Sequence, residues 1–279
     1  MQVYHDLVRK VLAEGVRKPS RTGVDTISLF SAHYQVNLAD GFPLLTTKKM
    51  QWPSLLRELL WYLSGENHIR NLREYTRIWD DWADEDGNLD TAYGSYWRHF
   101  PSATKDEHGR WQVREVDQIR HVIETLRRDP NSRRLVVSAW EPGNAISSKL
   151  PPCHYTFAFH VANRRLNCHL CQRSGDIALG IPFNMAAYAA LTQMIAQEVG
   201  LEAGLFGHTI VDAHIYCADP DSPMAEYDHV AGLKEQLKRE PLPLPRLEIA
   251  RKPFEELRYE DFELVGYQHH AAIRFKVAV

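Results

Sequence analysis

The hydrophobic pattern of the chain changes period near residue 135, and this change restricts the fold more than any other feature. Upstream, apolar residues recur at helical spacing. Downstream, segments rich in β-branched and aromatic residues predict strands over residues 135–140, 155–161, 166–171, 209–216, 247–250, 262–267 and 272–277. Some of these are joined by short turns, such as the one at Asn163 and Arg164. Such turns favour an antiparallel or mixed sheet over a doubly wound parallel one.

Helices are predicted on both sides of this change in period. Apolar spacing predicts them over residues 4–14, 52–63, 116–128, 184–199 and 224–238, with an early strand over 26–38. Two polar stretches, residues 105–110 and 240–245, are too short to separate domains and predict turns. We therefore expect an α+β fold, a mixed or antiparallel sheet covered by helices, in a single domain over residues 1–279.

Composition excludes several classes of protein. Hydrophobic residues make up 44% and charged residues 25%, which is typical of a globular protein. No apolar run reaches the ~18 residues of a membrane span, and the N-terminal segment lacks the hydrophobic stretch of a secretory signal. We therefore expect a cytoplasmic protein with no membrane partner and with its 4 cysteines reduced. The net charge of −3 argues against a broad nucleic-acid-binding face.

Cys153 stands in the stretch LPPCHYTF, directly after two prolines and before a predicted strand. A lone cytosolic cysteine is ordinarily a buried packing residue. Here the prolines fix the backbone, a strand mouth can face a pocket, and arginines elsewhere can favour the thiolate, so the alternative is a nucleophile. His154 follows directly, but neighbouring strand residues point to opposite faces, which argues against it as the base for Cys153.

The cluster formed by Cys168, His169 and Cys171 is the candidate for a metal site. Residues three apart on a strand face opposite sides of the sheet, so Cys168 and Cys171 cannot easily share one ion. No second cluster completes the four ligands of a structural zinc site. We therefore expect no metal and a core position for Cys168.

Four arginines stand in short polar motifs: Arg21 in SRTG, Arg133 and Arg134 in NSRRLVV, and Arg173 in QRSGD. Each is ordinarily a solvated surface charge. Arg21 and Arg173, however, are each followed by a hydroxyl residue and a glycine, which add donors suited to a phosphate. The sequence has no GxxxxGK[ST] loop, so a monophosphate is expected rather than a nucleoside triphosphate.

Four further residues each have a structural and a functional interpretation. Glu58 is either paired with an arginine or buried beside aromatic neighbours, where its raised pKa suits proton transfer near neutral pH. Asn184 in GIPFNMAAY is either a helix cap or an amide that binds a heterocycle edge. His214 and Tyr216 in DAHIY share one face of a strand, where they either fill the core or hold a sugar hydroxyl.

Taken in order, these segments resemble the thymidylate synthase family. The resemblance covers nearly the whole chain, from RTG at residue 21 through DGFPLLTTKK, ELLWYLSGE, IWDDWADEDG, AYGSYW, SRRLVVSAW, LPPCH, QRSGD, LGIPFN and DAHIY to the terminal KVAV. It implies a homodimer that converts dUMP to dTMP. The co-substrate would be 5,10-methylenetetrahydrofolate, which donates the one-carbon unit and hydride and leaves as dihydrofolate.

The resemblance also implies roles for individual residues. Cys153 would add to C6 of the pyrimidine and so activate C5. Glu58 would organise proton transfers, Tyr93 would assist removal of the C5 proton, and Asn184 would bind the uracil edge. The residues implied to hold the substrate are Arg21, Arg133, Arg134, Arg173, Ser174, Asp176, Asn184, His214 and Tyr216. Of these, the adjacent arginine pair would come from the second subunit, which makes the dimer part of the site.

A folate site is implied in the same way. Its residues are Gln51, Trp79, Trp82, Leu150, Asp176, Gly180, Phe183 and Ala278. The final residues would close over the complex and exclude water during hydride transfer. Three departures from the family pattern concern this region. Gln51 replaces a basic residue of some relatives, CADPDSPMAEYDHVAG after Tyr216 is longer than usual, and GYQHHAAIRF replaces a proline-containing segment. We expect their effect on folate affinity rather than on the core chemistry.

Two other functions fit part of the pattern. A pyrimidine monophosphate hydroxymethylase shares the fold and the covalent step but traps the one-carbon unit with water. Asn184 favours uracil over cytosine, and Trp79 and the KVAV tail favour a methyl product. A non-catalytic RNA-binding regulator would use the arginines and aromatic residues, but the net acidity and the lack of a basic stripe count against it.

Overall fold

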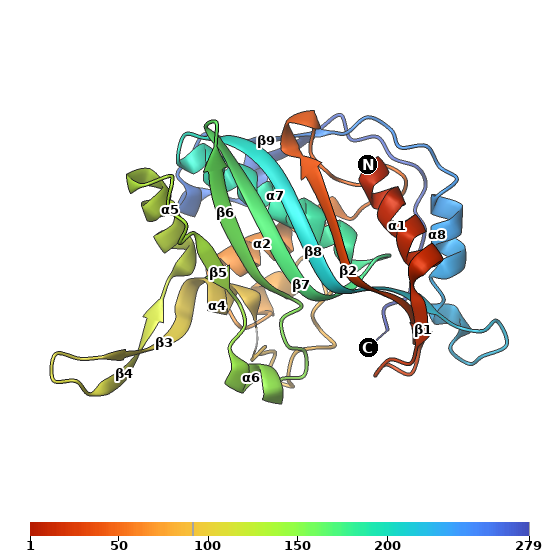
Figure 1. The fold of residues 1–279 in the computed structure, drawn as a ribbon, viewed down its shortest axis with the longest axis horizontal. Helices are drawn as coiled ribbons and strands as arrows, with labels where there is room; N and C mark the ends of the chain where they lie inside the picture. Colours follow the sequence, from red (N-terminus) through yellow and green to blue (C-terminus); the bar gives the residue numbers. More distant parts are fainter. Residues whose placement is uncertain (91, 279) are drawn as a thin grey trace.

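A six-stranded mixed sheet forms the centre of the fold in the computed structural model, which describes residues 1–90 and 92–278 (Figure 1). Its strands are β1 (Val16–Lys18), β2 (Asp25–Asn37), β5 (Val136–Ser138), β6 (His154–Ala162), β7 (Arg165–Asp176) and β8 (Glu202–Cys217). Their order is β1-β2-β8-β7-β6-β5. The β7–β8 pair is parallel and the other pairs are antiparallel. The predicted α+β class with a mixed sheet is confirmed.

Helices cover one face of the sheet. The buried helix α7 (Gly180–Glu198) packs on β7 and β8, and α2 (Trp52–Ser64) packs on α7 (Figure 1). Because α7 lies between the sheet and α2, it is apolar nearly all round. The remaining helices are α1 (Gln2–Glu14), α3 (Arg70–Arg73), α4 (Tyr93–His99), α5 (Gln118–Arg128), α6 (Pro142–Ser147) and α8 (Val230–Gln236), with 3₁₀ turns η1 (Leu38–Asp40), η2 (Ala225–Tyr227), η3 (Phe254–Glu256) and η4 (Tyr259–Asp261). No helix in the described part of the chain is long and apolar enough to cross a membrane.

Two strand pairs lie outside the central sheet. β3 (Phe100–Lys105) and β4 (Trp111–Val116) form a hairpin that projects from the body, and β9 (Arg246–Ile249) pairs with β10 (Phe262–Val265) (Figure 1). The polar stretch 105–110 is the tip of the projecting hairpin. Its two strands were not predicted, because both hairpin strands are largely exposed and carry no clear hydrophobic alternation.

Several predicted boundaries are wrong. Residues 272–277 form no strand. They lie outside any sheet and are held by other contacts, such as that of the Lys276 carbonyl oxygen, which lies 2.9 Å from His229 Nε2. The predicted helix 224–238 divides into η2 and the shorter α8, and α7 begins four residues before Asn184. β8 begins seven residues earlier than predicted. The reason is Gly204 and Gly207, which suggest a turn but here allow close approach of Asn167 and His169.

The turn at Asn163 and Arg164 is confirmed. Both residues have positive φ angles, 50° and 60°, which is the geometry of the two-residue turns that suit the twist of a hairpin. The turn fixes the antiparallel register of β6 and β7. One hydrophobic cluster extends from α1 to β10. That continuity agrees with one domain over residues 1–279, which stays a prediction.

Candidate active site

A cavity of about 610 Å³ brings together most of the predicted site residues. It lies where β7 ends and β6 begins, and its walls come from α2, β8, the start of α7 and the C-terminal segment. The predicted residues that line it are Arg21, Glu58, Trp79, Trp82, Tyr93, Leu150, Cys153, Arg173, Ser174, Asp176, Gly180, Phe183, Asn184, His214, Tyr216 and Ala278. Val279, the last residue of the KVAV tail, lies outside the described residues.

Three predicted site residues do not line the cavity. Gln51 is exposed at the N-cap of α2, so the structure does not bring it to the predicted folate site. Arg133 and Arg134 are exposed in the segment that leads into β5. Their position outside the cavity of their own subunit is the one required if they act on a neighbouring subunit.

The backbone of Cys153 is held on both sides. Its N–H donates to the hydroxyl oxygen of Tyr93 at 2.7 Å, and its carbonyl accepts from the N–H of Arg173 at 2.8 Å. The Arg173 side chain donates to the carbonyl oxygens of Pro152 and Pro151 at 3.0 and 2.6 Å. The two prolines therefore do more than stiffen the chain, because their carbonyls also orient Arg173.

The Cys153 thiol is protonated at rest. Burial raises its pKa, while the nearby Arg173 and Arg21 guanidinium groups act in the opposite direction and lower it. The expectation that arginines favour the thiolate is correct in direction, but burial outweighs them. Deprotonation must therefore accompany attack on a substrate.

His154 is a packing residue beside the nucleophile. Its ring stacks on Tyr93 with centroids 3.6 Å apart and an interplanar angle of 3°. Its Nδ1 lies 2.8 Å from the hydroxyl of Tyr188, and burial lowers its pKa to about 3, so the ring is neutral. These contacts agree with the argument against His154 as the base for Cys153.

Glu58 is held by aromatic donors. Its Oε1 accepts hydrogen bonds from Trp79 Nε1 at 2.7 Å and from the Tyr62 hydroxyl at 2.9 Å. Burial raises its pKa to about 7, and the two hydrogen bonds partly offset that effect. The functional interpretation of Glu58 is the one that the geometry supports, because its hydrogen bonds go to aromatic side chains and no arginine pairs with it among the described residues.

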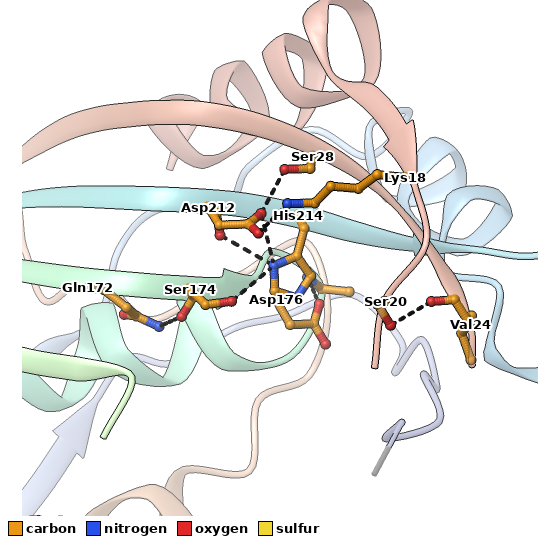
Figure 2. A network of polar contacts seen from close by, with 10 residues as sticks. Lys18, Ser20, Val24, Ser28, Gln172, Ser174, Asp176, Asp212 and His214 are labelled. Atoms are coloured by element: carbon orange, nitrogen blue, oxygen red, sulfur yellow. Dashed lines mark hydrogen bonds and ion pairs between the residues drawn. The ribbon is translucent and has the colours of Figure 1, made fainter. Parts of the chain in front are cut away.

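A polar network contributes several side chains to the cavity lining (Figure 2). Asp212 accepts from Lys18 Nζ at 2.7 Å and from the Ser28 hydroxyl at 2.7 Å. His214 Nδ1 lies 3.3 Å from the Asp212 carbonyl oxygen and 3.5 Å from the Ser174 hydroxyl. Burial acts to raise the pKa of Asp212, but hydrogen bonds from these neighbours hold it well below its usual range. The resulting negative charge lies beside His214, whose Nδ1 is 3.6 Å from Asp212 Oδ1.

The pairing of His214 and Tyr216 on one strand face is confirmed, with ring centroids 5.3 Å apart and both side chains lining the cavity.

Asp176, at the end of β7, links this region to the C-terminal segment. Its Oδ1 lies 3.6 Å from His229 Nδ1, and His229 Nε2 lies 2.9 Å from the Lys276 carbonyl oxygen. The buried His229 ring therefore joins Asp176 to the end of the chain.

Asn184 is not a helix cap. It lies in the second turn of α7, because that helix begins at Gly180. Its side chain lines the cavity and makes no hydrogen bond to the described residues. The amide is therefore free to bind a ligand, as its functional interpretation requires.

Sequence reasoning missed several lining residues: Lys18, Pro19, Ser20, Thr22, Thr26, Tyr62, Ile78, His154, Gln172, Leu179, Asp212 and Val277. Strand period could have found Gln172, which lies two residues before Ser174 and donates to its carbonyl oxygen at 2.8 Å. Lys18 gave no such signal, because its partner Asp212 is far away in the sequence. No group of three or more metal-ligating side chains occurs in the parts of the chain that the structure describes.

A half-buried thiol, a carboxyl group with a pKa near 7 and two guanidinium groups in one cavity form the arrangement expected of an enzyme that works through covalent catalysis. The comparisons with known proteins make this specific. The family model described as "Thymidylate synthase" matches residues 2–279. A thymidylate synthase from Haloferax volcanii is 50% identical over 326 residues, which cover 98% of this chain and 95% of that protein.

The chain therefore belongs to the thymidylate synthase family. It is an enzyme of the methyltransferase class, its function is that of a thymidylate synthase, and its co-substrate is 5,10-methylenetetrahydrofolate. The resemblance seen in the sequence is confirmed, and the hydroxymethylase alternative is not favoured.

Proposed function

We propose that this cavity converts dUMP to dTMP through a transient bond between Cys153 Sγ and C6 of the uracil ring. Sulfur addition to C6 moves an electron pair to C5, which attacks the one-carbon unit of the co-substrate. Loss of the C5 proton then expels the tetrahydrofolate nitrogen from the one-carbon unit and leaves an exocyclic methylene at C5. Hydride transfer from the tetrahydrofolate to this methylene, with departure of the sulfur from C6, gives dTMP and dihydrofolate. The observation that carries this proposal is that Cys153, Glu58 and Asn184 line one cavity.

The cavity has separate groups for the parts of the nucleotide. Arg21, Arg173 and Ser174 supply charge and donors for the phosphate. His214 and Tyr216 lie together on β8, where they would hold the deoxyribose hydroxyl. The unpaired amide of Asn184 would bind the uracil edge, which presents an acceptor and a donor side by side.

Two groups would handle protons. Glu58 has a pKa of about 7 and so exchanges a proton near neutral pH. The hydroxyl oxygen of Tyr93 accepts from the Cys153 N–H, and the hydroxyl also interacts with the Cys153 thiol, so Tyr93 would lie close enough to assist removal of the C5 proton.

The walls of the cavity fit a flat, partly apolar co-substrate. Trp79, Trp82 and Phe183 supply aromatic surface, while Leu150 and Gly180 complete the lining. Asp176 would accept from the ring nitrogens of the folate. Burial acts to raise the pKa of Asp176, but His229, His214 and the Ala178 N–H together lower it, which favours the ionised form. Ala278 lines the cavity from the C-terminal segment, which His229 anchors, so this segment would exclude water.

The uncovered face of the sheet supports the homodimer that we propose. In Figure 1 the face of β5 to β8 turned away from α7 carries no helix. Val136, Leu205 and Val211 lie on this face and are 48%, 39% and 42% exposed. Apolar surface on a sheet is typical of a subunit interface. Arg133 and Arg134 directly precede β5 at its edge, so a second copy would receive them in its phosphate site. We also propose that the dimer is cytoplasmic, as the sequence leads us to expect.

Product analysis tests the proposed function. Purified protein is mixed with dUMP and methylenetetrahydrofolate, and the nucleotide and folate products are identified. We expect dTMP and dihydrofolate in equal amounts. A hydroxymethylated nucleotide with tetrahydrofolate would show that water replaces hydride. Absence of turnover, together with RNA binding that is the same in the wild type and in Cys153→Ser, would favour the non-catalytic RNA-binding regulator.

Glu58 is expected to set the pH dependence of the reaction. Replacement of Glu58 with Gln should lower kcat by about 10²-fold or more, because a group with a pKa near the working pH is lost. The limb of the kcat profile near pH 7 should disappear as well. In Trp79→Phe the limb should move to higher pH, since the lost hydrogen bond favours the carboxylate. The measurement is kcat from about pH 5.5 to 9, and an unchanged limb in Glu58→Gln would assign it to another group.

A further inference from the structure

A second cavity, of about 590 Å³, lies on another face of α2. Residues 57, 61 and 64 line it at helical spacing, whereas Glu58 and Tyr62 line the active-site cavity. Its other walls come from the segment around α3, from α7 and from residues 254–260. The volume is close to that of the active site and falls within the range of small-molecule sites.

Arg57 is held in this cavity between two aromatic rings. Its guanidinium carbon lies 3.8 Å from the ring centroid of Tyr75 and 3.8 Å from that of Tyr259. The stacking occupies both faces of the guanidinium plane and leaves the N–H groups at its edge. These N–H groups make no hydrogen bond to the described residues, and the ion pair with Glu260 spans 3.7 Å, too long for a hydrogen bond. Arg57 is therefore a fixed cation with unused donors.

The other cations of the cavity already have partners. Arg98 Nη2 lies 2.8 Å from Glu255 Oε1, and Arg258 Nη1 donates to the carbonyl oxygens of Glu255 and Leu257 at 2.9 Å. Arg57 differs because its ion-pair partner, Glu260, is 75% exposed and can move away without loss of packing. An incoming anion would replace an exposed carboxylate rather than break a buried pair.

The chemistry of the walls defines the rest of the ligand. Beside Arg57 the apolar surface comes from Leu60 and Leu63 of α2, which are half-buried, while Trp61, Leu72 and Met194 are buried and Glu66 also lines the cavity. Such a surface binds a flat or apolar body, while the planar guanidinium fork matches the two oxygens of a carboxylate. Inorganic phosphate would satisfy the cation but leave the apolar wall uncovered.

We propose that this cavity is a second ligand site, which takes a small aromatic or apolar carboxylate whose two oxygens bind the edge of Arg57 in place of Glu260. The stacked guanidinium is fixed before the ligand arrives, which reduces the entropy lost on binding. The site is distinct from the active-site cavity, so the inference holds whichever reaction that cavity performs.

Calorimetry with 2-naphthoate as the probe tests this inference, with dUMP present at saturation to occupy the active site. We expect one naphthoate site per chain and at least about tenfold weaker binding of the neutral 2-naphthamide. Arg57→Gln should weaken naphthoate binding by at least about tenfold as well. Arg70→Gln, which changes an exposed arginine outside the cavity, should leave it unchanged.

Glu260→Gln provides a test in the opposite direction. Glu260 is exposed, so its loss should not harm folding, and removal of the competing carboxylate should tighten naphthoate binding by about two- to fivefold. If Arg57→Gln fails to fold, the naphthoate affinity of Glu260→Gln still tests the proposed site. Equal naphthoate affinity in the wild type and Glu260→Gln, equal affinity for naphthamide, or loss of the naphthoate site on addition of dUMP would each overturn the proposal.

Discussion

Cys153→Ser is expected to lower kcat by about four orders of magnitude, because an alcohol cannot replace the thiolate in addition to C6. Binding of dUMP should change little. Arg173 keeps its bonds to the carbonyls of Pro151 and Pro152, and serine fits the space of cysteine. The measurements are the steady-state rate of dihydrofolate formation and the dissociation constant of dUMP by calorimetry.

Mass spectrometry separates covalent catalysis from a general loss of structure. Wild-type protein incubated with 5-fluoro-dUMP and methylenetetrahydrofolate should gain the mass of both molecules on the peptide that contains Cys153. The Cys153→Ser variant should gain none. Cys171→Ser is the matched control, because that thiol lies on β7 outside the cavity, and its adduct should be unchanged. An adduct that persists in Cys153→Ser would place the nucleophile elsewhere.

Short motifs predicted much of the candidate site because each lies where a strand or helix meets the cavity. Cys153 precedes β6, Ser174 and Asp176 end β7, and Asn184 lies in the second turn of α7. Strand period alone placed His214 and Tyr216 together, which holds because β8 is regular at that point. The family resemblance then supplied roles that spacing cannot give.

Other features could not be predicted, because they depend on contacts between distant segments. The hydrogen bond from Trp79 to Glu58 joins a loop to a helix, and no local pattern shows that a tryptophan would be the donor. The segment 272–277 alternates as a strand does, but its Lys276 carbonyl oxygen contacts the His229 side chain instead of a strand partner. A period indicates which face of a segment is buried and not what covers it.

Arg133 and Arg134 are expected to act on the neighbouring subunit, and their replacement should be almost as damaging as loss of the nucleophile. The double variant Arg133→Ala/Arg134→Ala removes two charge-assisted contacts to the phosphate, which should reduce kcat/KM by about 10²- to 10⁴-fold. Both side chains are exposed, so stability should be nearly unchanged. The effect is measured as kcat/KM for dUMP, with Arg120→Ala, an exposed arginine on α5, as the control.

Subunit mixing then distinguishes a shared site from a local one. When the Cys153→Ser and Arg133→Ala/Arg134→Ala proteins are unfolded, mixed in equal amounts and refolded together, half of the dimers should contain one chain of each kind. In such a dimer one site has both defects and the other has neither, so activity should return to about a quarter of the wild-type value, far above either parent. If the arginines served the cavity of their own chain, every site would keep one defect and mixing would restore nothing. Recovery of activity would therefore require guanidinium groups that cross the proposed interface on the uncovered face of β5 to β8.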